Sequence, residues 1–340
     1  MAARPPLALR RARVLEASGQ RLRVELLEGP LLGHGVPALS LFGRAPATGD
    51  EVLVNLLGPE MGLGTGGVAF VLPMREPDAA IPENEDHFVK LPYTPLQHPA
   101  LAPRERDDLL GVPVVVLPLH SHLAPACCAA ADLRPGVRVA FVWQEGGALP
   151  VAFSKVVGEL AESGLLHAVV SSGACFGGDF EAPNAYSGML YAAGPEVGAD
   201  LVISGIGPGV VGTATAHGHG GMSAAVALNA ASSLGASPVL APRLSDADGR
   251  ARHRGFSHHT FSALRAALAG CRVALPEGAG ALPDGLPRRH SYERVPYGAA
   301  GLEGRYGVTF SSMGRGYRDD KVFFDAAAAA VALALGERVL

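Results

Sequence analysis

The chain has 340 residues, a formal net charge of −4 and a sequence pI near 6.3. Its length exceeds that of a typical single domain and favours two domains, while the lack of a basic excess argues against binding to a nucleic-acid backbone. Hydrophobic residues make up 48% of the chain and charged residues 18%, as is typical of a globular protein.

The sequence also argues against a membrane protein. The most apolar stretch, residues 322–336, contains Asp325 and is too short to span a bilayer. The N-terminus lacks the apolar core of a signal peptide, and the four cysteines show no CxxC spacing, which favours reduced thiols. We therefore expect a cytoplasmic protein without nucleic-acid or membrane partners.

The first part of the chain shows the pattern of short β-strands. Apolar and polar side chains alternate in residues 21–27, as in a strand with one buried face. Short apolar runs punctuated by Gly and Pro follow at residues 38–42, 51–56 and 67–72. Several strands at this spacing favour a small closed or partly closed barrel. The polar, proline-rich residues 74–86 predict a linker or exposed loop, and we assign residues 1–96 to this all-β domain.

From residue 97 to residue 340 the pattern changes to strands and helices in alternation. Near-continuous apolar strands separated by helices are typical of a buried parallel sheet. We therefore predict an α/β domain with a doubly wound, mostly parallel sheet. The predicted strands span residues 113–119, 138–143, 168–172, 200–204, 238–242, 272–275, 292–295 and 308–311. The predicted helices span residues 125–132, 149–163, 183–193, 221–234, 259–269 and 320–335.

Polar and glycine-rich segments follow five of the predicted strands, beginning near residues 119, 144, 171, 205 and 243. In an open α/β sheet, ligands bind beyond the carboxyl ends of the strands, where helix N-termini favour negative charge. Because these segments would share one rim of the sheet, we place the ligand site there.

Residues 205–213, Gly-Ile-Gly-Pro-Gly-Val-Val-Gly-Thr, are the strongest single candidate for a ligand-binding loop. Glycines allow the backbone to approach a ligand, and a threonine hydroxyl can donate to an oxyanion. The predicted anion-binding residues are therefore Gly207, Gly209, Gly212 and Thr213. No Gly-Lys-Ser/Thr follows, Gly205, Gly207 and Gly209 do not have the spacing of GxGxxG, and no acidic partner for a ribose is evident. A tight turn that packs a helix on a strand is the alternative interpretation.

Histidines are dense near the end of the predicted rim. Imidazoles close to carboxylates suit a metal site or a general acid/base pair, so the predicted catalytic residues are His253, His258, His259, Asp179 and Glu181. The spacing matches no zinc signature, and HExxH is absent. Two interpretations of these histidines stay open, a site for a divalent metal and solvated loop histidines. The identity of any cofactor also stays open.

Further side chains on the rim are candidates for contact with an anion. Arg243 and Arg254 would neutralise its charge. Lys90 either reaches the crevice or belongs to an extended connector, and Lys155 either reaches the anion or extends to solvent. Cys175 is either a thiolate nucleophile or a small buried hydrophobe. The remaining candidates are His120, Ser121, Gly177 and Gly178.

Six motifs together resemble one bacterial family. They are Gly62-Leu-Gly-Thr-Gly-Gly67, Lys90-Leu-Pro-Tyr-Thr-Pro-Leu-Gln97, Ala148-Leu-Pro-Val-Ala-Phe-Ser154, Gly177-Gly-Asp-Phe-Glu181, Gly207-Pro-Gly-Val-Val-Gly-Thr213 and His253-Arg-Gly-Phe-Ser-His-His259. This combination, spread over nearly the whole chain, is similar to the domain-of-unknown-function 3866 family. The resemblance implies no activity, because that family has none assigned, and it implies no fixed histidine at His217 or His219.

These observations support two hypotheses of different classes. The first is an enzyme, a hydrolase or a transferase, that acts on a small anionic metabolite carrying phosphate or carboxylate. The second is a non-catalytic metabolite-binding or sensory protein that uses the same cleft. A purely structural interaction module is a third option. The apolar helices are compatible with a homodimer.

Overall fold

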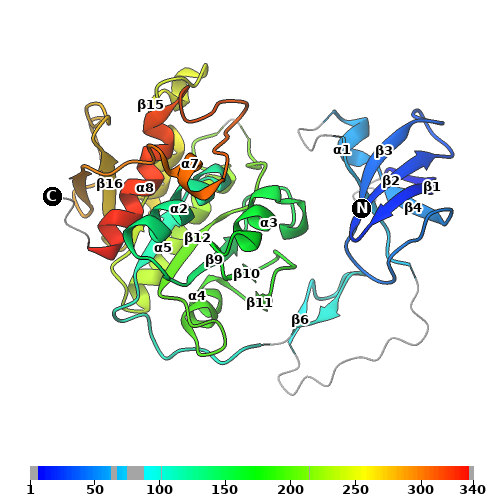
Figure 1. Cartoon of the computed structure of the whole chain (residues 1–340), viewed down its shortest axis with the longest axis horizontal. Helices are drawn as coiled ribbons and strands as arrows, with labels where there is room; N and C mark the ends of the chain where they lie inside the picture. The colour runs from blue at the N-terminus through cyan, green and yellow to red at the C-terminus, as the bar shows by residue number, and fades with distance from the viewer. Residues whose placement is uncertain (1–6, 63–66, 75–87, 101, 214, 337–340) are drawn as a thin grey trace, which may run out of the picture. The chain divides into compact units, whose positions relative to one another are not determined.

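The computed structural model describes residues 7–62, 67–74, 88–100, 102–213 and 215–336 (Figure 1). The chain divides into two compact units. The first unit comprises Met1–Glu83 and Thr94–Leu96, and the second comprises Asn84–Tyr93 and Gln97–Leu340. Most of the predicted linker, and the middle of the motif that begins at Gly62, lie outside the described residues. No helix of the described chain is long and apolar enough to cross a membrane.

The first unit contains a closed β-barrel with the strand order β1-β2-β3-β5-β4. Antiparallel pairing of β1 with both β2 and β4 closes the barrel, whereas β3 and β5 are parallel. In β2 the alternate residues Leu22, Val24 and Leu26 are buried in the barrel core, which is the alternation expected from the sequence. The elements are β1 (Leu9–Ser18), β2 (Arg21–Leu26), β3 (Gly35–Ser40), β4 (Glu51–Asn55), α1 (Leu57–Glu60) and β5 (Ala69–Val71).

The second unit is built on an eight-stranded sheet with the order β11-β10-β9-β12-β8-β13-β16-β17. Every pair of neighbouring strands is parallel. The predicted fold class, α/β with a small N-terminal barrel, is therefore confirmed. The strands are β8 (Val114–Leu117), β9 (Val139–Gln144), β10 (Ala168–Ser172), β11 (Phe180–Ala182), β12 (Leu201–Ile206), β13 (Val239–Leu240), β16 (Arg272–Pro276) and β17 (Ser291–Val295).

Helices cover both faces of this sheet, as a buried parallel sheet requires. Val115 and Leu117 of β8 pack with α2, α3, α7 and α8, whereas Val114 and Val116 pack with α4, α5 and α6 on the opposite face. The helices are α2 (Leu123–Leu133), α3 (Lys155–Glu162), α4 (Ala185–Ala193), α5 (Ser223–Ser233), α6 (His258–Ala266), α7 (Leu302–Tyr306) and α8 (Lys321–Leu335).

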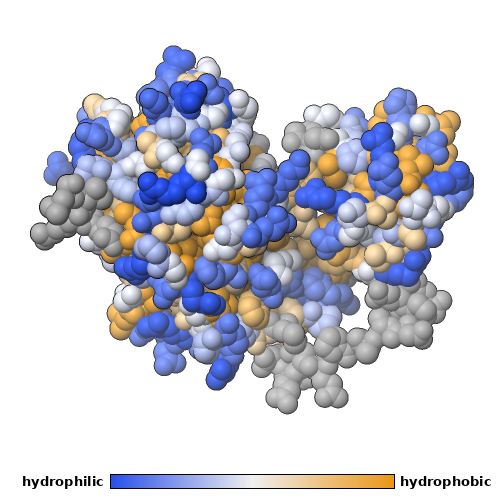
Figure 2. Space-filling model, in the orientation of Figure 1, coloured by the Kyte–Doolittle hydropathy of each residue, from blue (hydrophilic) through white to orange (hydrophobic). Residues whose placement is uncertain are grey.

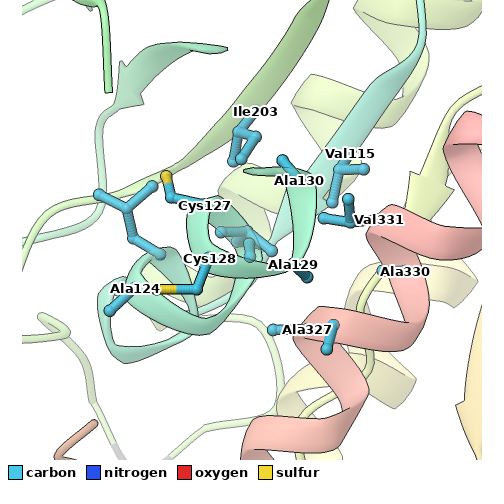
Figure 3. Packing of buried hydrophobic residues seen from close by; sticks show 14 of the residues in the cluster. Val115, Ala124, Cys127, Cys128, Ala129, Ala130, Ile203, Ala327, Ala330 and Val331 are labelled. Carbon is cyan, nitrogen blue, oxygen red and sulfur yellow. The ribbon is translucent and has the colours of Figure 1, made fainter. Parts of the chain in front are cut away.

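Helices α2 and α8 pack closely because alanine dominates their facing sides. Figure 3 shows Ala129 and Ala130 of α2 near Ala327 and Ala330 of α8, with Val115 of the sheet beside them. Cys127 and Cys128 are fully buried in the same cluster, and burial raises the pKa of Cys128 to about 12. On the visible surface, hydrophilic and hydrophobic residues are interspersed over each unit (Figure 2).

Short elements lie near the loops of the second unit. Two small antiparallel ribbons form, one from β6 and β7 and one from β14 and β15. Three-residue 3₁₀ helices follow or precede several strands and helices. These elements are β6 (Val89–Lys90), β7 (His98–Pro99), η1 (His120–His122), η2 (Val151–Phe153), η3 (Gly220–Met222), β14 (Leu244–Ser245), η4 (Ala251–His253) and β15 (Gly255–Phe256).

Three predicted elements differ from the structure. Residues 308–311 form no strand, because the backbone N–H of Phe310 donates to the carboxylate of Glu303 rather than to a neighbouring strand. The predicted helix over 149–163 is broken at Ser154, whose extended backbone separates η2 from α3. Strand β11 was predicted as part of a loop, yet it pairs with β10 at the sheet edge.

Candidate functional site

The strands β12, β8 and β13 are neighbours in the middle of the sheet. The helix that follows β8, α2, and the helix that follows β12, α5, pack on opposite faces. The loops that leave these two adjacent strands therefore part from each other. Such a switch point, outside the carboxyl ends of the strands, is where open α/β sheets bind ligands.

Four histidines meet in the loops that follow β12 and β13: His219, His253, His258 and His259. We call them the histidine cluster. The rings of His219 and His259 stack, with centroids 3.8 Å apart and an angle of 13° between their planes. The ring centroid of His258 lies 4.4 Å from that of His259 and 4.8 Å from that of His253. His258 is half-buried and the other three side chains are buried.

Ser257 positions two members of the cluster, His253 and His259. It precedes α6 and caps that helix by accepting a hydrogen bond from the backbone N–H of His259. Its hydroxyl also lies 2.8 Å from Nδ1 of His253 in η4. A serine directly before two histidines therefore both begins the helix and ties η4 to its first turn.

Two ring nitrogens of the cluster are buried without a hydrogen-bond partner among the described residues. They are Nδ1 of His219 and Nε2 of His258. Nε2 of His219 lies 3.0 Å from the backbone carbonyl of Ala216. Because a carbonyl only accepts, Nε2 carries the proton in this contact, and Nδ1 of the neutral ring carries a free lone pair.

A buried ion-pair network adjoins the histidines. Nη1 of Arg243 is 3.5 Å from Nδ1 of His259, and Nη2 donates to Asp248 at 3.0 Å. Arg250 makes a two-point contact with the same carboxylate. Arg315 lies 3.8 Å from Asp248 and 3.4 Å from Asp320. Three guanidinium groups therefore face two carboxylates.

This environment keeps the histidines neutral. Burial lowers the pKa of His253 to about 3 and that of His259 to about 2, with neighbouring cations, Arg243 among them, adding to the effect. Burial also lowers the pKa of Arg243 itself to about 10, against the attraction of Asp248. The pKa of Asp248 is lowered chiefly by its hydrogen bond from Arg250. Neutral imidazoles can accept protons or bind metals.

The predicted glycine loop lies on the same rim and packs tightly against the loop after β9. A Cβ added at Gly207 would collide with the indole of Trp143, and one added at Gly147 would lie 2.5 Å from the carbonyl oxygen of Gly207. The N–H of Val211 donates to Gly146, and the N–H and hydroxyl of Thr213 both donate to Gly218. Close packing thus accounts for Gly207, while anion binding by Gly209 and Gly212 stays a prediction.

Asp179 and Glu181 lie at the β10–β11 edge of the sheet. Neighbouring strands are about 4.8 Å apart, so β10 and β13, with three strands between them, lie about 19 Å apart. Residues 173–179 also turn back along the sheet edge, so that Asp179 bonds with Val169 near the start of β10. The carboxylate of Asp179 thus contacts Val169, and the pairing of these carboxylates with His253, His258 or His259 stays a prediction.

The polar groups at the β10–β11 edge satisfy one another. Glu181 accepts from the N–H of Gly177 at 2.6 Å and pairs with Nε2 of His98 at 2.9 Å. Buried Lys90 donates to the carbonyls of Gly173 and Ala182. Gly178 has a positive φ of 93° and lies against the backbone of Val169, where a side chain would collide.

The remaining predicted residues occupy different places on the rim. His120 is buried beside Trp143, with its Nε2 2.7 Å from the hydroxyl of Ser154, which caps α3. Ser121 lies in the same turn, η1, and is half-buried. Lys155 and Arg254 are exposed. Burial raises the pKa of Cys175 to about 11, so its thiol is protonated at neutral pH, which disfavours a nucleophile.

Comparison with known proteins identifies the family of this chain. A family model described as "Protein of unknown function (DUF3866)" matches residues 39–331. The chain belongs to the DUF3866 family. The match confirms the family expected from the six motifs. Neither the comparison with curated proteins nor that with solved structures gave a match.

In this DUF3866 protein, two residues at the cluster were not among the predicted site residues: Arg252, and His219, which the family resemblance had put in doubt. His219 reaches the cluster because the glycines around it leave room: a Cβ at Gly221 would lie 3.1 Å from Nδ1 of His219 and 3.4 Å from Cβ of His259. The exposed Arg252 has its Nε 3.4 Å from Nε2 of His253. A histidine among glycines directly before a helix was the available signal for His219.

The histidine cluster is also where this DUF3866 protein could hold a metal ion. One ligand atom each from His219, His258 and His259 lies within 4.8 Å of the others. Three neutral imidazoles are a donor set that suits zinc, copper, iron or nickel. Carboxylates play no part in this group.

Proposed function

We propose that this protein is an enzyme, a hydrolase or a transferase, that acts on a small anionic metabolite at the histidine cluster. The observation that carries the proposal is the meeting of four histidines with the Arg243 network at the carboxyl end of the sheet. Buried groups that need hydrogen-bond partners and lack them indicate a ligand site more strongly than polar character alone.

The charges around the cluster favour a negatively charged substrate. Arg243, Arg250 and Arg315 outnumber the two carboxylates that they contact. The exposed guanidinium of Arg252 adds a fourth positive charge beside His253. Guanidinium groups bind phosphate and carboxylate oxygens with two parallel hydrogen bonds, so these are the groups we expect on the substrate.

The half-buried His258 is the member of the cluster best placed to meet a substrate from solution. Its Nε2 is without a partner in the described structure, and it lies at the beginning of α6, where N–H groups and the helix dipole favour an anion. We assign the first contact with the substrate to His258, directly or through an ion bound at its Nε2, and positioning of His253 to Ser257. Arg252 would attract the anion into the site.

A thermal-shift screen of phosphorylated and carboxylated metabolites tests this proposal. Hits would then be assayed for turnover by product analysis. We expect Arg252→Gln to weaken the binding of a stabilising metabolite about ten-fold, as loss of a charged hydrogen bond would. Arg254→Gln, also exposed and two residues away, tests the sequence-based choice and should have a smaller effect. Arg265→Gln, in the last turn of α6, is the control.

Two results would contradict the proposal. Equal stabilisation of wild type, Arg252→Gln and His258→Ala by the same metabolite would place the binding site elsewhere. Binding at the cluster without any turnover would exclude the enzyme and leave the metabolite-binding or sensory alternative.

A further inference from the structure

We propose that His219, His258 and His259 bind one Zn²⁺ ion. The inference shares its location with the proposed function and rests on it for a role in the reaction, but zinc binding itself requires no substrate. The argument starts from the two ring nitrogens of the cluster that are buried without partners in the described residues, Nδ1 of His219 and Nε2 of His258.

The hydrogen bond from His219 to Ala216 has the form of an outer contact of a metal ligand. Metal-binding histidines commonly donate one ring N–H to a backbone carbonyl, which fixes the tautomer and directs the other nitrogen to the ion. Nε2 of His219 makes this contact at 3.0 Å. The side chain is 7% exposed, so its unused lone pair lies in the interior. An interior lone pair is costly when neither a hydrogen-bond donor nor a metal ion contacts it.

Binding of one ion requires only local movement of the three imidazole rings. The three ligand atoms lie within 4.8 Å of one another, whereas a tetrahedral ion with Zn–N bonds of about 2.0 Å needs nitrogens about 3.3 Å apart. The stacked rings of His219 and His259 must tilt apart to direct their nitrogens to one ion. The contact of 3.5 Å between Arg243 and His259 is at the limit of a hydrogen bond and is easily given up.

The donor set selects the ion. Magnesium and calcium prefer oxygen ligands, and this group offers only imidazole nitrogens. Zinc sites that take part in reactions have three protein ligands and an open fourth position for water. Asp248 offsets the charge of the nearest guanidinium, that of Arg243, which reduces the repulsion that a bound cation would meet.

Zinc titration of the purified, chelator-treated full chain by calorimetry tests the site, with Co²⁺ absorption as a readout of coordination geometry. We expect one ion per chain and the spectrum of a tetrahedral cobalt site. His219→Ala and His258→Gln should each weaken zinc binding by at least about 100-fold, since even outer contacts contribute 10- to 100-fold. His217→Ala, an exposed histidine two residues from His219, should leave the affinity unchanged.

Unchanged zinc affinity in both His219→Ala and His258→Gln would overturn the proposal, as would the absence of stoichiometric binding to wild type. Thermal unfolding of the zinc-free variants identifies any that fail to fold. If His219→Ala fails to fold, the zinc affinity of His258→Gln, a variant at a half-buried position, tests the proposal. Metabolite binding and turnover by a chelator-treated protein that takes up no zinc in the titration would reject the zinc site and keep the proposed function. Zinc binding by a protein that binds no anionic metabolite and shows no turnover would keep the zinc site and reject the proposed function.

Discussion

The β10–β11 edge and the histidine cluster are two polar regions of the same α/β unit that differ in how their groups are satisfied. At the edge, Glu181 contacts His98 and the N–H of Gly177, and Lys90 donates to two carbonyls. In the cluster, two buried ring nitrogens have no partner among the described residues.

This difference separates residues that hold the fold from residues available to a ligand. Buried polar groups in proteins are almost always hydrogen-bonded, so unpartnered ones require an explanation. At the edge, the contacts are complete, and we interpret Lys90 and Glu181 as stabilising the turn that leads into β11. In the cluster, the incomplete contacts mark the place where a metal ion or substrate would supply them.

Acidification should have the largest effect and should act on the histidine-rich rim. Burial lowers the pKa of His120 to about 4 and that of His122 to about 3, with Arg243 also lowering the latter. In the unfolded chain both titrate near 6.5, so below that pH the unfolded state binds protons that the folded state does not, and stability is lost as pH falls. Between pH 7 and pH 5 we expect a loss of about 2 kcal/mol for each histidine.

Urea unfolding at the two pH values measures this loss. His120→Phe should remove about half of the contribution of this pair, because the variant has one titrating group fewer. Equal free energies of unfolding at pH 5 and pH 7 would show that these two histidines do not resist protonation.

Lys90→Met should lower the free energy of unfolding by about 2 to 3 kcal/mol, because the carbonyls of Gly173 and Ala182 lose their buried donor. Zinc and metabolite binding at the cluster should be unaffected. Lys155→Met, at an exposed position in the first turn of α3, provides the matched control, with an expected change within about 0.5 kcal/mol. If the two variants are equally stable, the edge contributes less than its contacts indicate.

Glu181→Gln should have the smallest effect, a loss of about 1 kcal/mol, because the amide keeps one oxygen to accept from Gly177 and loses only the charge that faces His98. Urea unfolding measures the loss. Turnover of any substrate identified should be unchanged. A loss of activity with little loss of stability would instead return Glu181 to the active site and remove the distinction between the two regions.

Much of the fold could be predicted from the sequence because its signals are local. The alternation in residues 21–27 and the apolar runs of β8, β9, β10 and β12 each depend only on neighbours in the chain. The strand predicted at 308–311 was wrong because its buried side chains resemble those of a strand while its backbone bonds to Glu303.

The candidate site was only partly predictable. His253, His258 and His259 are close in sequence, and they meet in the structure through the capped start of α6. Asp179 appeared to follow β10 on the rim, but the chain turns back to form β11, and this reversal depends on pairing that no local pattern reveals. His219 joins from a loop more than thirty residues away, through space left by Gly221.

The sequence by itself determined the two kinds of secondary-structure pattern, the family and the histidine-rich segment after β13, because periodicity, motifs and composition are written along the chain. Only the tertiary structure decided the order of the strands, and with it which loops are neighbours. Packing between segments distant in sequence also placed His219 against His259 and His98 against Glu181, because no segment by itself fixes which polar groups it meets.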